Sequence, residues 1–145
     1  MRERKLTAYY CDYCNKRGLS KFYMTRHEKH CTLSPERSCR LCDAHNADLI
    51  KDAMELLPGI PDVNQDEWHE KLIIDGGSVT KLENDIEAAM PAMYRAVDYC
   101  PACMLAAMRQ SGATKFRAYT DYKEDVKEWW SAKDTERQEK RMYYC

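Results

Sequence analysis

Six of the eight cysteines form three Cys-x-x-Cys pairs, and this spacing constrains the fold more than any other feature of the chain. The N-terminal residues are charged and no apolar run follows them, so we expect no signal peptide, no membrane span and a cytoplasmic location. Thiols stay reduced in that compartment, and paired cysteines there usually bind metal. The pairs are Cys11/Cys14, Cys39/Cys42 and Cys100/Cys103.

The first pair is followed by a histidine and a cysteine at the spacing of a zinc site. A Cys-x-x-Cys turn presents two thiolates on one side, and zinc requires four tetrahedral nitrogen or sulfur ligands. His27 and Cys31 are four residues apart, so a helix would place them on one face. His30 is an alternative fourth ligand. We predict a structural zinc ion bound by Cys11, Cys14, His27 and Cys31.

This segment resembles the two-cysteine, two-histidine zinc finger, with a cysteine in place of the last histidine. Tyr9 and Met24 stand where that family keeps apolar core residues. The inner aromatic residue of the family aligns with Gly18, so we expect Leu19 or Phe22 to take its place. The resemblance implies a ββα finger that covers about a sixth of the chain.

The other two Cys-x-x-Cys pairs are separated by 57 residues and together supply four thiolates. Four thiolates form a closed structural site. Cys39 and Cys42 lie in a short turn, a zinc knuckle, and Cys100 and Cys103 stand at a predicted helix start. This combination resembles the zinc-ribbon and treble-clef family. His45 in place of one cysteine, and pairing of Cys11/Cys14 with Cys39/Cys42, are alternatives. We predict a second zinc ion bound by Cys39, Cys42, Cys100 and Cys103.

The rest of the chain predicts a mainly α fold with small β-knuckles. Apolar spacing predicts helices over 43–57, from Thr80 towards Tyr99 with a kink or restart at Pro91, over 102–110, and from 121 to about 141. We divide the chain into a zinc finger module (1–35), a helical domain clamped by the four-cysteine site (36–112), and a charged amphipathic helix with its tail (113–145).

The charge distribution is asymmetric, although the net charge is only −1. Residues 1–40 carry ten Lys or Arg and four Asp or Glu, a net charge of +6. Residues 41–111 carry five against thirteen, a net charge of −8, and the remaining residues carry +1. The middle of the chain therefore repels phosphate, and a nucleic-acid footprint is expected on the first forty residues.

We expect a non-enzymatic regulator that binds DNA or RNA through the finger and takes no small-molecule substrate. Both zinc sites look closed, and a catalytic zinc keeps an open position. A nuclease of the His-Asn-His type would need a partner for His69, and no second histidine follows it. In the finger family the helix reads bases. The corresponding candidate residues are Lys16, Arg17, Ser20, Lys21, Tyr23, Arg26 and Lys29.

The alternative is a protein–protein interaction protein, an adaptor or an inhibitor of a larger complex. It would use the acidic middle and the aromatic C-terminal region, where adjacent tryptophans cannot share one helix face. Composition and size also resemble the small zinc proteins of bacteriophages and prophages, some of which would act against host defences. Cys145 is a spare thiol in this interpretation. The candidate contact residues are Trp129, Trp130, Tyr143 and Tyr144.

Overall fold

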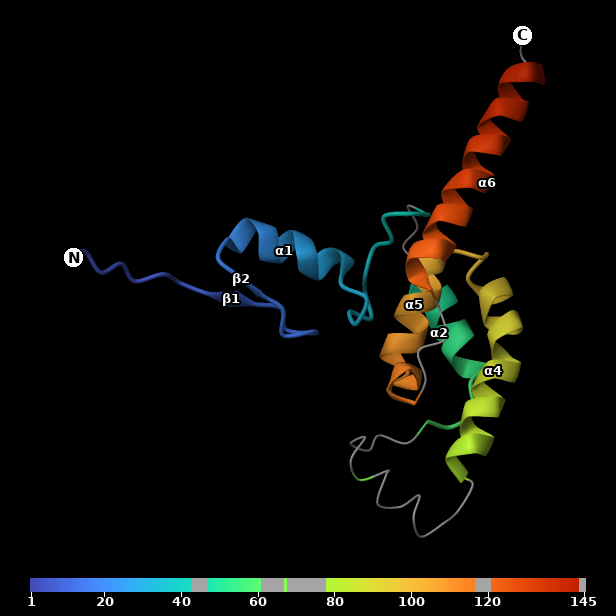
Figure 1. Cartoon of the computed structure of the whole chain (residues 1–145), viewed down its shortest axis with the longest axis horizontal. Coiled ribbons are helices and arrows are strands. Elements are labelled where there is room, and N and C mark those ends of the chain that lie inside the picture. The colour runs from blue at the N-terminus through green and yellow to red at the C-terminus, as the bar shows by residue number, and fades with distance from the viewer. Residues whose placement is uncertain (43–46, 61–66, 68–77, 117–120, 144–145) are drawn as a thin grey trace.

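The computed structural model describes residues 1–42, 47–60, 67, 78–116 and 121–143, and these residues are mainly helical (Figure 1). Among the described residues, a two-stranded sheet and one helix come first, and further helices follow. The elements are β1 (Tyr9–Tyr10), β2 (Arg17–Gly18), α1 (Lys21–His30), α2 (Ala47–Glu55), α4 (Ser78–Ala96), α5 (Pro101–Gln110), the 3-10 turn η1 (Ala113–Lys115) and α6 (Tyr122–Tyr143).

The N-terminal unit is an antiparallel hairpin followed by α1. Tyr9 pairs with Gly18 and Tyr10 pairs with Arg17. The helix begins after Ser20, whose hydroxyl oxygen accepts a hydrogen bond from the backbone N–H of Tyr23 (3.3 Å). Such a cap satisfies a backbone donor that has no partner within the helix.

The apolar core of this unit differs from the expectation for its aromatic position. Leu19 and Phe22 are 58% and 78% exposed, so neither replaces the inner aromatic residue. Met24 lies in the core as expected, packed with Cys11 and Cys31, and Tyr9 packs against this cluster. A side chain at Gly18 would collide with it, because a Cβ there would lie 2.6 Å from the Met24 sulfur. Gly18 therefore leaves the room that the Met24 side chain occupies.

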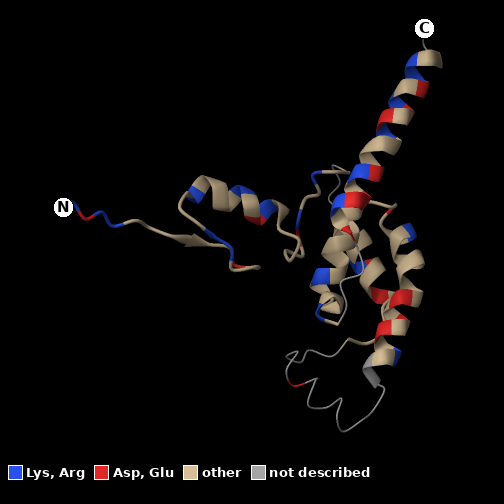
Figure 2. Ribbon diagram, viewed as in Figure 1, with Lys and Arg blue, Asp and Glu red and all other residues tan. Residues whose placement is uncertain are grey.

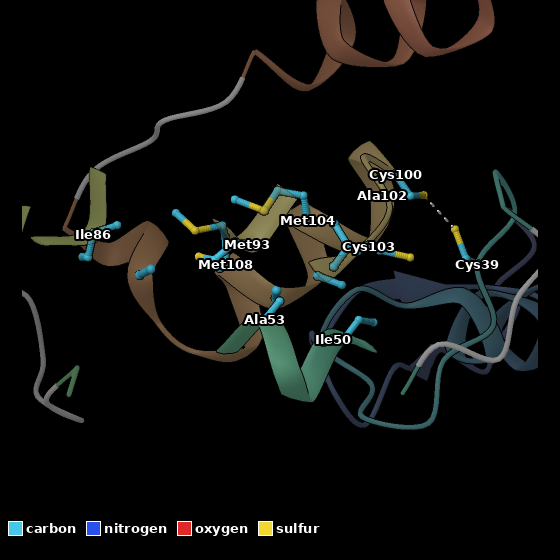
Figure 3. Close-up of a cluster of buried hydrophobic side chains, with 14 residues drawn as sticks. Cys39, Ile50, Ala53, Ile86, Met93, Cys100, Ala102, Cys103, Met104 and Met108 are labelled. Atoms are coloured by element: carbon cyan, nitrogen blue, oxygen red, sulfur yellow. Dashed lines mark hydrogen bonds between the residues drawn. The ribbon is translucent and has the colours of Figure 1, made fainter. Parts of the chain in front are cut away.

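Helix α5 forms the centre of the helical body. Seven of its ten residues are buried, among them three alanines, which let neighbouring helices approach closely, and two methionines, which fill the remaining gaps. Helices α2 and α6 both contact α5, and α2 also contacts α4. Figure 3 shows the side chains that meet in this core. They include Ile50, Ala53, Ile86, Met93, Met104 and Met108.

Helix α4 begins two residues before the predicted start and ends three residues before Tyr99. It begins at Ser78, so Thr80 lies inside it and does not start it, and it continues through Pro91 without a restart. Two residues with positive φ, Asp98 (52°) and Tyr99 (60°), follow its end. The backbone N–H of Tyr99 donates to the Tyr94 carbonyl oxygen at 2.8 Å, which closes the last turn.

Helix α6 is attached to the body at its start and projects away from it beyond that point (Figure 1). The Tyr94 hydroxyl donates a hydrogen bond to an Asp125 carboxylate oxygen (3.1 Å). Residues 131–143 are all exposed. Ion pairs one turn apart, such as Lys140 with Glu136 at 2.9 Å, line this exposed half.

Outside α6, which carries both signs, the basic and acidic positions concentrate in different parts of the structure (Figure 2). Figure 2 shows acidic positions gathered on α4, on the side of the helical body away from the N-terminal hairpin, while the hairpin and α1 carry mostly basic positions. Within the described residues, no helix combines the length and the apolar character that crossing a membrane requires.

Neighbouring positions on α2 offer a test of this packing. We expect Ile50→Ala to lower the free energy of unfolding by about 2–5 kcal/mol, because Ile50 is 1% exposed and its loss leaves a cavity. Leu49→Ala should cost less than about 1 kcal/mol, because Leu49 is 36% exposed. Urea unfolding of the metal-saturated proteins measures both values, and equal losses would contradict the packing of α2.

Candidate metal centres

The hairpin and the end of α1 bring four metal-ligating side chains together. Cys11 and Cys14 come from the turn after β1, and His27 and Cys31 come from the last turn of α1 and the residue that follows it. Their ligand atoms all lie within 4.8 Å of one another. The Cys14 sulfur lies 3.2 Å from His27 Nε2. Two thiolates from a turn and two ligands one helical turn apart form a four-ligand metal site.

The backbone between the first two cysteines shapes this site. The Asn15 N–H donates to the Cys11 carbonyl oxygen, and the Cys11 N–H donates to the Lys16 carbonyl oxygen, both at 3.0 Å. Asn15 has a φ of 57°, a conformation that asparagine tolerates better than most residues. This tight turn directs both sulfurs towards α1.

The structure decides between the two candidates for the fourth ligand. His30 lies outside the cluster, and its Nδ1 is 2.8 Å from the Ser38 carbonyl oxygen. Cys31 is 3% exposed and lies inside the cluster. His30 therefore links α1 to the following segment, and Cys31 completes the ligand set.

The second cluster joins residues far apart in sequence at the start of α5. The sulfur of Cys39 lies 3.6 Å from that of Cys100 (Figure 3), and the sulfur of Cys42 lies 3.6 Å from that of Cys103. Tetrahedral coordination with bonds of about 2.3 Å requires sulfur–sulfur distances of about 3.8 Å. A disulfide would require about 2 Å. The four sulfurs are therefore arranged as ligands of one ion.

The alternative ligand sets are wrong or lie outside the described residues. Cys11 and Cys14 belong to the same cluster as His27, so they do not pair with Cys39 and Cys42. His45 lies outside the described residues, as do His69 and Cys145. The spacing of the cysteines therefore predicted both groups of four correctly.

The electrostatics of both clusters favour a bound cation. Burial raises the pKa of Cys31 to about 11, and the neighbouring sulfurs of Cys14 and Cys11 add to this increase. The neighbouring thiols of Cys103 and Cys39 and the burial of the site raise the pKa of Cys100 well above its usual range. Several thiolates cannot share so small a volume unless a cation compensates their charge.

His27 is held in the neutral form that can bind a metal. Burial lowers its pKa, and the positive charges of Lys16 and Arg40 lower it further. A neutral imidazole has a free lone pair, whereas an imidazolium has none. Lys16 lies in the hairpin turn and Arg40 in the second knuckle, so charges from both units act on this histidine.

Hydrogen bonds to α5 connect the two clusters. The Gln110 side-chain amide donates to the carbonyl oxygens of Thr32 (3.0 Å) and Ser34 (2.9 Å). Arg109 Nη1 donates to the Thr32 hydroxyl at 2.8 Å, and Arg37 Nη1 donates to the Ala102 carbonyl oxygen at 3.3 Å. The segment 32–37, between the clusters, therefore lies against α5.

The residues expected to bind nucleic acid are all exposed, and they surround α1. Arg17 lies in β2, and Ser20 uses its hydroxyl as the helix cap. The Lys16 ammonium lies 5.7 Å from the centre of the Tyr23 ring. Two further cations near α1, Arg37 and Arg40, are not among the residues predicted from the sequence. Their positions on either side of Cys39 could have indicated that they lie close to a metal cluster. The exposed set comprises Lys16, Arg17, Ser20, Lys21, Tyr23, Arg26 and Lys29.

The residues expected to contact a protein partner have different environments. Trp129 is half-buried and Trp130 is 42% exposed, with their ring centres 4.9 Å apart in an edge-to-face arrangement. Tyr143 is 89% exposed, and Tyr144 lies outside the described residues. Trp130 and Tyr143 are thus the accessible aromatic residues of this set.

Comparisons with known proteins found no similar protein: no family model matches the chain, and searches of curated proteins and of solved structures gave no match. The conclusions about the site therefore depend on its geometry alone.

The ligand assignment of the first cluster can be tested by counting bound metal. We expect Cys31→Ala to bind one metal ion fewer per chain than the unmodified protein, because three ligands remain. His30→Ala should keep the full number, because His30 contacts a backbone oxygen and not the cluster. Native mass spectrometry measures the ion count. Loss of an ion from His30→Ala would contradict the assignment.

The raised thiol pKa values predict that metal retention depends on pH. Cys31, with a pKa of about 11 in the metal-free protein, is protonated at neutral pH, so the metal must displace a proton. Lowering the pH therefore favours metal loss. In a competition with a chromogenic chelator, we expect metal to be retained at about pH 8 and lost progressively towards about pH 5. Equal retention across this range would contradict the prediction.

Proposed function

We propose that this chain is a non-enzymatic zinc protein that binds nucleic acid through its basic N-terminal finger, residues 1–35, and acts as a small regulator. The observation that carries the proposal is the arrangement of exposed basic residues around a short helix held by a metal cluster. Lys21, Arg26 and Lys29 lie on α1, and Lys16 and Arg17 lie in the hairpin beside it. Phosphate groups bind to such clusters of Lys and Arg.

Zinc is the ion that we assign to both clusters. Three thiolates with one imidazole, and four thiolates, are the donor sets typical of structural zinc, and neither leaves an open coordination position. Zinc would supply stability and no reaction chemistry here. Bound zinc contributes about 10–16 kcal/mol to small modules of this kind. The core of the first unit has few buried residues besides its cysteines, so its fold would depend on the ion.

The finger resemblance and the charge pattern support the same binding mode. Residues 1–40 carry a net charge of +6, while the acidic residues of α4 lie on the far side of the helical body (Figure 2). The first two turns of a finger helix supply the base-contacting side chains. Arg26 lies just before the ligand His27, where an arginine could contact guanine.

Charge reversal on α1 tests the proposal. We expect Lys21→Glu combined with Arg26→Glu to weaken binding to nucleic acid by about 100-fold or more at low salt, because four units of charge change at the footprint. Fluorescence anisotropy across about 50–200 mM salt measures the affinity and its salt dependence. The matched control is Lys51→Glu with Lys81→Glu, which makes the same charge change on α2 and α4. No binding by the zinc-loaded protein at low salt would refute the proposal.

A second candidate function is protein binding by the C-terminal half of α6. The specific observation is that residues 131–143 are all exposed on a helix that extends beyond the body (Figure 1). Met142 and Tyr143 are 81% and 89% exposed, and such apolar residues often mark contact sites. An adaptor, or an inhibitor of a larger host complex as the phage-like composition suggests, would use this helix and the acidic middle of the chain.

Removal of residues 143–145 separates the two functions. If this helix binds a protein partner, the truncated chain should lose a stoichiometric partner in affinity purification and keep its affinity for nucleic acid. The Lys21→Glu, Arg26→Glu variant should behave in the opposite way. Quantitative mass spectrometry of the purified complexes provides the measurement. A partner retained equally by both proteins would exclude the tail as its binding site.

A further inference from the structure

A cavity of about 540 Å³ lies between α1 and the start of the helical body, and its lining is strongly basic. Its cations come from both units: Lys16 and Arg26 from the hairpin and α1, and Arg37 and Arg40 from the segment that leads to the second cluster. No Asp or Glu lies among its described lining residues. Four cations without a carboxylate repel one another, so an anion would be favoured here.

Arg37 is the most buried of the four cations that line this cavity. The residue is 4% exposed, and only its Nη1 donates a hydrogen bond, to the Ala102 carbonyl oxygen, within the described part of the chain. Its buried Nε has no hydrogen-bond partner. A guanidinium has five N–H donors, and leaving them unsatisfied in a buried position is costly. An anion in the cavity would offset part of the cost of burying the charge of Arg37.

Neutralisation of the thiolates in the second cluster does not account for all four cations around this cavity. Arg40 lies between Cys39 and Cys42 and can offset their charge. Lys16 and Arg26 belong to the other unit and face the same cavity. His27, which belongs to the first cluster, lines the same cavity. The positive potential therefore extends across the junction.

A second cavity of about 430 Å³ adjoins the first and shares Arg40 and Leu41 with it. Its α6 side is lined by Trp129 and Trp130, with Lys133 and Arg137 one and two turns later. The Lys133 ammonium lies 5.5 Å from the centre of the Trp129 ring, and Trp130 is 42% exposed. Asp98 is the one acidic residue among its described lining residues. Cations and aromatic rings thus continue from one cavity into the next.

We propose that this basic–aromatic track binds a single strand of nucleic acid, which makes the partner of the proposed function single-stranded. The track comprises Lys16, Tyr23, Arg26, Arg37 and Arg40 in the first cavity, and Trp129, Trp130, Lys133 and Arg137 in the second. Its cations contact phosphates, and bases stack on the exposed rings of Tyr23 and Trp130. Proteins that bind single strands combine these two elements, because every base has a face that can stack.

The position of Arg26 argues for a single strand over a duplex. Arg26 is the residue expected to read guanine from the major groove, yet it lines the cavity between α1 and the helical body. The helical body therefore lies beside the part of α1 that would have to enter the major groove of a duplex. A single strand is thin enough to enter this junction, and its unstacked bases are free to contact the rings.

The test uses the full-length zinc-loaded protein with labelled oligonucleotides of about 15 nucleotides. The probes are oligo-dT, oligo-U and a duplex of equal length. We expect single strands to bind about tenfold more tightly than the duplex, with quenching of tryptophan fluorescence. Trp130→Ala should weaken single-strand binding about tenfold, and Arg40→Gln should reduce the slope of log affinity against log salt by about one.

Two measurements keep the variants interpretable. Zinc content and circular dichroism verify that each variant is folded, and Arg141→Gln on the exposed end of α6 is the control for loss of one positive charge outside the track. This control should reduce the affinity much less than Arg40→Gln. Equal effects of the two substitutions would overturn the track as the binding site.

The possible results separate this inference from the proposed function on which it rests. Binding of single strands that Trp130→Ala and Arg40→Gln both weaken supports the track. Duplex binding equal to or tighter than single-strand binding, lost in Lys21→Glu with Arg26→Glu, overturns the track and leaves the finger as a duplex reader. Failure to bind any nucleic acid at low salt overturns both proposals.

Discussion

The grouping of four sulfurs at the start of α5 is the constraint on which the rest of the structure depends. It fixes the point where the chain leaves the knuckle at Cys42 and the point where it returns at Cys100. Because Cys100 immediately precedes α5, the cluster also fixes the helix against which α2 and α6 pack. The positive φ values of Asp98 and Tyr99 turn the chain sharply enough for α5 to begin there.

The junction between the two clusters combines a structural role with the proposed binding role. Arg37 and Gln110 hold the linking segment against α5 through hydrogen bonds to backbone oxygens. The same Arg37 lines the basic cavity that faces α1. Stability and the proposed recognition therefore share side chains at this point. The relative placement of the clusters determines how far apart the cations lie.

Ligand identity followed from the sequence, because tetrahedral coordination permits few spacings, and all eight predicted ligands lie in the two clusters. Helices α2, α5 and α6 also followed from apolar and charge periodicity, and the ends of α5 and α6 differ from the prediction by at most two residues. Other features depended on tertiary packing. Neither Leu19 nor Phe22 joins Met24 in the small core, and α4 continues through Pro91. Arg37 and Arg40 become neighbours of Arg26 only after folding.

The sequence order of the ligands has a consequence for synthesis on the ribosome. The first cluster has all its ligands once Cys31 has been made, whereas Cys39 and Cys42 must wait for Cys103. At about 5–20 residues per second, this interval lasts roughly 3–12 s. During this interval, metal-free Cys11 and Cys14 could bind one ion together with Cys39 and Cys42, which would form a non-native four-thiolate site. Cys11 and Cys14 can bind an ion together with His27 and Cys31 before Cys39 and Cys42 are made, and they are then no longer available to a wrong site. The order of translation therefore favours the correct ligand pairing.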